Sequence, residues 1–115
     1  MLDPRIDVTA SVRFPAKTYG REPLITTGHS YFRHFLFVEY GMDKLRLISK
    51  SDESEMVYEM PRVETAALRM SYTPVEHALV IYVTGSPVIQ HRLERLVSAP
   101  AEIDLGRNIS DPFLT

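Results

Sequence analysis

The sequence predicts a mainly β domain of the α+β class, with six to seven antiparallel strands in a small bent sheet or barrel and one C-terminal amphipathic helix. Three observations support this fold class. Residues 5–14 alternate strictly between polar and apolar side chains, as a strand with one buried face does. Further short apolar segments recur about every 8–12 residues, separated by turn-forming residues. A helical period is found once, near the C-terminus.

The first strand, 5–14, is the clearest element, and Pro15 ends it. Its apolar face consists of Ile6, Val8, Ala10, Val12 and Phe14. The loop over 15–29 is rich in Pro and Gly and carries one short strand. The turn Gly41-Met42-Asp43 joins the next two strands as a hairpin. The strands after the first are expected at 23–27, 30–40, 44–50, 56–60, 63–72 and 78–83.

The last regular element is predicted to be a helix over 86–97. Ser86 is a favourable N-cap, and Pro87 would occupy the first helical position. Apolar residues follow at i, i+4, i+7 and i+8: Ile89, Leu93, Leu96 and Val97. Residues 1–100 are therefore expected to form one domain. Residues 101–115 form a C-terminal tail, either draped over the domain or loose until a partner binds.

Antiparallel strands followed by a closing helix resemble the pleckstrin-homology-like superfold, a bent barrel plugged by its last helix. Some domains of that architecture bind inositol phosphates between their first two strands, so the resemblance implies an anionic head group as one possible ligand. A three-layer α+β domain with a helix in place of one strand is the alternative architecture.

Composition limits the class of protein. The 115 residues include no cysteine, which excludes disulfides and cysteine-based metal sites. The N-terminus lacks the basic and apolar segments of a signal peptide, and no apolar run is long enough for a membrane span. We therefore expect an intracellular protein, cytoplasmic or nuclear. The net charge of −2 argues against nucleic-acid binding.

No catalytic, metal or cofactor site is expected. The four histidines have no spacing typical of metal ligands. Ser30 and His34 share a strand face, but four residues separate their backbones by about 13 Å, too far for a nucleophile and its base. A small enzyme that uses His29 and Tyr31 stays as a third hypothesis.

The leading hypothesis rests on an excess of apolar residues. In strand 30–40, Phe35 and Phe37 point away from the face that carries Leu36 and Val38, so both faces are apolar. Exposed apolar patches usually mark interfaces, and aromatic and arginine residues are frequent hot spots. We therefore expect a non-enzymatic protein–protein interaction module, a homodimer or a subunit of a larger assembly, whose partner is another protein or a second copy. The expected partner-binding residues are Tyr31, Arg33, Phe35, Phe37, Phe113 and Leu114.

The alternative function is binding of an anionic, phosphoinositide-like head group. It would use basic residues in and near the loop after the first strand: Arg13, Lys17, Arg21 and Arg33.

Overall fold

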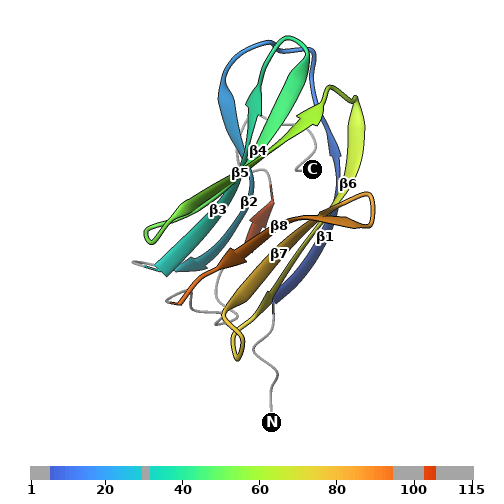
Figure 1. Cartoon of the computed structure of the whole chain (residues 1–115). Helices are drawn as coiled ribbons and strands as arrows, with labels where there is room; N and C mark the ends of the chain where they lie inside the picture. Colours follow the sequence, from blue (N-terminus) through green and yellow to red (C-terminus); the bar gives the residue numbers. More distant parts are fainter. Residues whose placement is uncertain (1–5, 30–31, 95–102, 106–115) are drawn as a thin grey trace.

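Two antiparallel β-sheets pack face to face in the computed structural model, which describes residues 6–29, 32–94 and 103–105 (Figure 1). The four-stranded sheet has the order β1 (Ile6–Arg13), β6 (Thr65–Thr73), β7 (Ala78–Val83) and β8 (Ser86–Arg92). The five-stranded sheet has the order β5 (Glu55–Pro61), β4 (Lys44–Ser51), β3 (Phe32–Tyr40), β2 (Arg21–His29) and β9 (Ile103–Leu105). The protein is therefore mainly β, as the sequence predicts.

The core lies between the two sheets and is built from alternate residues of their strands. In β1, Ile6, Val8 and Val12 are buried and Ala10 packs against the core, while Asp7, Thr9 and Ser11 are exposed, so the predicted alternation is confirmed. The buried residues of β6 lie directly opposite in the register, with Ile6 facing Tyr72 and Val12 facing Ala66. Burying each large apolar side chain contributes about 1.5–3 kcal/mol, and this layer holds the sheets together.

The C-terminal helix predicted over 86–97 is wrong where the structure describes it, because residues 86–92 form strand β8. Thr84 and Gly85 have φ of 50° and 84°, and two consecutive positive φ angles are typical of a type I′ hairpin turn. That turn returns the chain beside β7. Pro87 is tolerated because β8 is an edge strand whose register with β7 shifts near it.

The helical prediction failed because a spacing of four residues between apolar side chains is compatible with both a helix and a strand. Ile89 and Leu93 are four residues apart, which places them on one face of a helix and equally on one face of a strand. In the structure both are buried, and so is His91 between them, which gives the period of two. The predicted helical residues 95–97 lie outside the described residues.

The described residues also do not show the pleckstrin-homology-like arrangement, since they contain no helix to close a barrel. The two sheets keep separate edges instead. Two predicted strands differ mainly in their bounds, because 23–27 extends to Arg21–His29 and 63–72 begins at Thr65. Within the predicted tail, β9 pairs with β2, with Leu105 opposite Ile25.

Among the described residues, no helix has the length and apolar character needed to cross a membrane.

Candidate functional site

The face of the five-stranded sheet that points away from the core carries an apolar cluster. Because side chains alternate along a strand, Leu36 and Val38 fill the core while Phe35 and Phe37 project from the opposite face. The register places Phe37 of β3 opposite Ile48 of β4. Ile48 in turn lies opposite Val57 of β5. We call these four residues the outer apolar patch: Phe35, Phe37, Ile48 and Val57.

The outer apolar patch is packed but open at its β5 side. The rings of Phe35 and Phe37 stack with centroids 5.6 Å apart and planes 16° apart. Ile48 is only 2% exposed although it does not belong to the core cluster between the sheets. Val57, at the sheet edge, is 51% exposed. The Arg21 guanidinium lies 5.6 Å from the Phe37 centroid, within cation–π range.

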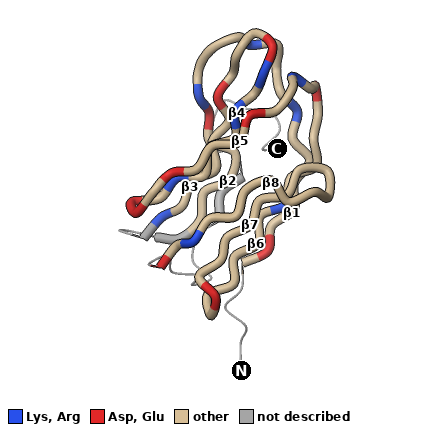
Figure 2. Tube along the Cα trace, in the orientation of Figure 1, with Lys and Arg blue, Asp and Glu red and all other residues tan. Residues whose placement is uncertain are grey.

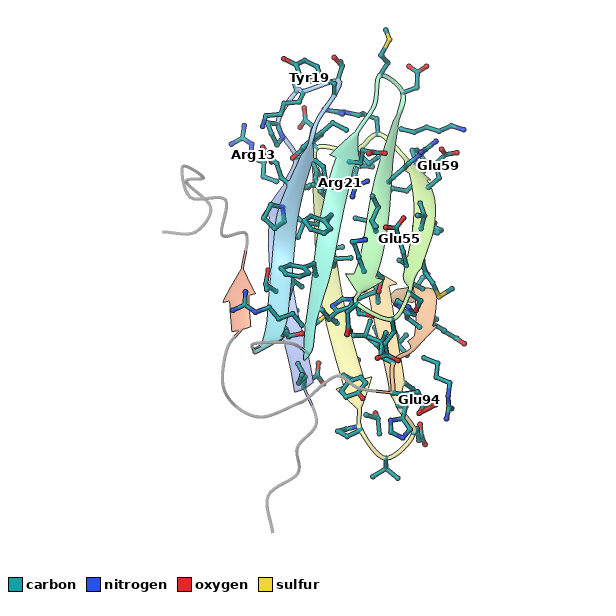
Figure 3. The ribbon with its side chains drawn as sticks, turned by 90° about the vertical axis from the view of Figure 1, so that its left-hand side faces the viewer. Arg13, Tyr19, Arg21, Glu55, Glu59 and Glu94 are labelled. Carbon is teal, nitrogen blue, oxygen red and sulfur yellow. The ribbon has the colours of Figure 1, made fainter. Side chains whose placement is uncertain are left out.

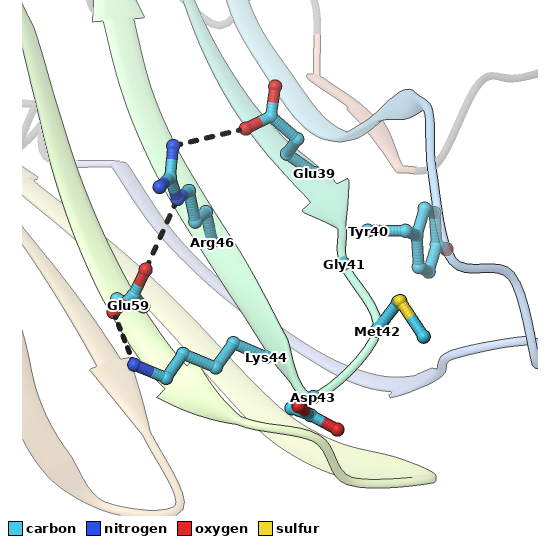
Figure 4. A pocket seen from close by; sticks show the side chains of 8 residues that line it. All are labelled: Glu39, Tyr40, Gly41, Met42, Asp43, Lys44, Arg46 and Glu59. Carbon is cyan, nitrogen blue, oxygen red and sulfur yellow. Dashed lines mark hydrogen bonds and ion pairs between the residues drawn. The ribbon is translucent and has the colours of Figure 1, made fainter.

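Charged side chains beside the patch are paired with opposite charges. Arg46 contacts both Glu39, at 3.6 Å, and Glu59, at 3.3 Å (Figure 4). Lys44 donates to Glu59 at 3.0 Å, and this hydrogen bond is the main reason that the pKa of Glu59 is lowered. These residues line a hollow of about 360 Å³ beside the β3–β4 turn. Basic and acidic positions are interspersed along the described chain (Figure 2).

Three of the six expected partner-binding residues lie on this outer face: Arg33, Phe35 and Phe37. Tyr31, Phe113 and Leu114 lie outside the described residues. Sequence reasoning missed Ile48 and Val57. The available signal was Ile48 itself, an apolar residue on the otherwise polar face of the strand 44–50.

The outer face of the four-stranded sheet is covered differently. Tyr82 of β7 lies under the Arg69 guanidinium at 5.1 Å. Arg69 also makes two hydrogen bonds to the Asp7 carboxylate, at 2.9 and 2.8 Å. The aromatic ring on this face is therefore capped by an ion pair of the same sheet.

The four basic residues expected to bind an anion do not all lie together. Lys17 forms an ion pair with Glu22. Arg21 lies beside Glu39, at 3.3 Å, near the turn end of β3 (Figure 3). Arg33 is opposite Gly28, six positions along β3 from Glu39, which corresponds to about 20 Å. Arg13 ends β1 of the other sheet and lies toward the same end of the molecule as Arg21 (Figure 3), so Arg33 is the cation that lies apart.

A chain of polar side chains crosses the core between the two sheets. His34 Nε2 lies 2.7 Å from Ser49 Oγ, and Ser49 Oγ lies 2.8 Å from His91 Nδ1. The other ring nitrogen of His91 lies 2.6 Å from Ser54 Oγ. His34 and Ser49 have no exposed surface and His91 is 3% exposed, whereas Ser54 is exposed at the β4–β5 hairpin. These hydrogen-bonded side chains therefore connect the buried interior to the surface.

Burial keeps both histidines neutral at pH 7. Desolvation, helped by the nearby His91, lowers the pKa of His34 from 6.5 to about 3. Desolvation also lowers the pKa of His91, and the negative charge of Glu53 partly opposes that effect. Neutral imidazole has one donor and one acceptor nitrogen, so His91 donates to one of its two serine neighbours and accepts from the other.

Sequence reasoning missed this chain because its members are distant along the sequence. The pairs are separated by 15, 42 and 37 residues, and only the pairing of the strands and the packing of the sheets brings them together. Ser30 and Tyr31 lie outside the described residues, and the side chain of His29 is not described. Across the described ranges, no three His, Asp or Glu side chains gather as metal ligands would.

Comparison with known proteins adds no family to these observations: no family model matches the chain, and no curated protein or solved structure is significantly similar to it.

Proposed function

We propose that the protein is a non-enzymatic protein–protein interaction module, acting inside the cell as a homodimer or as a subunit of a larger assembly. The outer apolar patch is its proposed binding surface. One observation carries the proposal: three adjacent strands of the five-stranded sheet place large apolar side chains outside the core, around a stacked pair of phenylalanines. Apolar centres with aromatic residues are typical of interfaces.

The charges around the patch favour a protein partner over a small anion. Arg21, Arg46 and Lys50 each lie within 3.6 Å of a carboxylate on a neighbouring strand. Their charge is therefore largely balanced before any ligand arrives. An apolar centre with a rim of both charge signs matches the usual anatomy of a protein interface.

The first partner to test is a second copy of the chain. The solution mass of the wild type would be measured by size exclusion with light scattering over a concentration series. We expect a dimer near twice 13.2 kDa at high concentration. Phe37→Asp should weaken association at least tenfold without unfolding the domain, because a charge on the patch must be desolvated on contact, at a cost of more than about 1.4 kcal/mol.

Val80→Asp provides the matched control. Val80 is a half-buried apolar residue on the outer face of the four-stranded sheet, so the same kind of change should leave the dimer intact. If Phe37→Asp unfolds the domain, Phe37 belongs to the core and the proposed surface is wrong. A wild type that stays monomeric at every concentration rejects the homodimer and leaves the larger assembly.

The absence of cysteine allows a second, direct test. Val57→Cys would introduce the chain's single thiol at the exposed side of the patch. Under mild oxidation, a dimer through this face should form a disulfide cross-link faster than Thr9→Cys, a thiol on the exposed outer face of β1. Equal rates for the two variants would contradict a dimer through the outer apolar patch.

A further inference from the structure

We propose that Ser54 is a nucleophilic hydroxyl which His91 activates as a general base, and that it accepts acyl or phosphonyl groups from electrophilic esters and related compounds. This modification site is separate from the outer apolar patch. It requires one transfer to Ser54 and no turnover, so it is compatible with a protein that is not an enzyme.

The geometry meets the first requirement for an activated serine. Ser54 Oγ lies 2.6 Å from His91 Nε2, inside the distance at which an imidazole can take the hydroxyl proton. Ser54 is exposed on the β4–β5 hairpin, whereas His91 is buried in β8. A reagent in solvent can therefore reach the hydroxyl while its base stays shielded from water.

The second requirement is a group that orients the base. Ser49 Oγ lies 2.8 Å from His91 Nδ1 and 2.7 Å from His34 Nε2. When His91 carries its proton on Nδ1, it donates to Ser49, and Ser49 donates to Nε2 of the neutral His34, whose Nδ1–H then has no hydrogen-bond partner among the described residues. Nε2 of His91 is then the acceptor that faces Ser54. Ser49 thus has the positioning role of the third member of a nucleophile–base–orienter arrangement.

Nearby charge favours the proton transfer. The carboxylate of Glu53 raises the pKa of His91 against the effect of burial, so it stabilises the imidazolium that forms when Ser54 gives up its proton. Glu53 is held in place by the backbone N–H of Glu94, which donates to its Oε1 at 2.9 Å.

The reaction balances without any redox partner. Ser54 Oγ forms a bond to the carbonyl carbon or to the phosphorus, and its proton moves to His91 Nε2. The bond from that carbon or phosphorus to the leaving group then breaks with its electron pair. The leaving group, when it needs a proton, takes it from His91. The product is an ester at Ser54.

A fluorophosphonate probe tests the proposal on the full chain. The Oγ–P bond forms, the P–F bond breaks and fluoride leaves. We expect one adduct at Ser54, located by peptide mass spectrometry, forming roughly 100-fold faster than any adduct at Ser11, an exposed serine of β1. Labelling of Ser54 at the rate of Ser11 would overturn the proposal.

Variants separate activation from simple exposure. Ser54→Ala should abolish the adduct, and His91→Gln should reduce the rate at Ser54 to that of Ser11. A rate unchanged in a folded His91→Gln variant would contradict activation by His91.

The wild-type pH profile gives a readout that depends on no variant. Protonated His91 cannot accept a proton, so the labelling rate at Ser54 should fall with a single ionisation as the pH is lowered. A rate that simply follows hydroxide concentration, with no break, would overturn the role of His91.

Discussion

His34 is a titratable side chain with no exposed surface, bonded through Nε2 to Ser49 at 2.7 Å. An imidazolium at this position would lose its hydration and would face His91 as well, so the neutral form is strongly favoured and the pKa falls to about 3. In the unfolded chain the same group titrates near 6.5. Below that pH the unfolded state binds the additional proton.

We therefore predict that acid lowers the free energy of unfolding. The contribution of His34 is fully present above pH 6.5 and is lost as the pH falls from 6.5 towards 3, at about 1.4 kcal/mol per pH unit. Between pH 7 and pH 5 the loss from this group is about 2 kcal/mol by that slope. His91, whose pKa is also lowered, acts in the same direction. Urea titrations monitored by circular dichroism at the two pH values measure the effect.

His34→Gln is the matched variant for this measurement. It keeps a polar group near Ser49 but has nothing to titrate in this range, so its stability should change less between pH 7 and pH 5. An equal loss in wild type and variant would show that another group causes the acid sensitivity.

The turn between β7 and β8 shows how two residues favour a β-hairpin over the predicted helix. Thr84 and Gly85 both have positive φ, a combination that glycine and asparagine adopt readily and a β-branched residue does not. An added Cβ at Gly85 would meet no atom within 4 Å, so conformation rather than space limits this position. The turn aligns β8 with β7 and so brings His91 opposite Leu79.

We predict opposite effects at the two turn positions. Gly85→Ala should lower the free energy of unfolding by about 1 kcal/mol, because alanine disfavours positive φ. Thr84→Asn should raise it by about 1 kcal/mol, because asparagine suits the first position of a type I′ turn. Urea midpoints at neutral pH provide the comparison. A neutral Gly85→Ala variant would contradict the hairpin turn.

At the scale of the whole molecule, the two sheets share one core and present two different outer faces. On the four-stranded sheet, Arg69 covers Tyr82 and pairs with Asp7. On the five-stranded sheet, Phe35 and Phe37 stack on each other at the centre of a charged rim. The proposed interaction therefore belongs to one face of the sandwich.

We predict that association through the outer apolar patch depends little on salt. Apolar contact is not screened, whereas binding of an anion to exposed cations weakens steeply as ionic strength rises. The dimer dissociation constant measured at low and at physiological ionic strength should change less than about threefold by this argument. Binding that is lost on adding salt would favour the head-group hypothesis built on Arg13, Lys17, Arg21 and Arg33.

The sequence by itself determined the mainly β class and most of the strands. Alternation in 5–14 located β1 and its buried face, because one-sided burial in a strand imposes a period of two. The opposed orientation of Phe35 and Leu36 predicted an apolar outer face for the same reason. The strand conformation and the alternation of its two faces depend on residues that are adjacent in the sequence, so they can be predicted from a local pattern.

Only the tertiary structure decided that residues 86–92 form a strand and that polar side chains from distant segments form hydrogen bonds through the core. Ile89 and Leu93 fit a helix and a strand equally well, and the choice depended on pairing with β7. Ser54 and His91 are 37 residues apart, and nothing local connects them. Contacts between distant segments depend on strand pairing and sheet packing. The hydrophobic periodicity of a single segment carries no information about either.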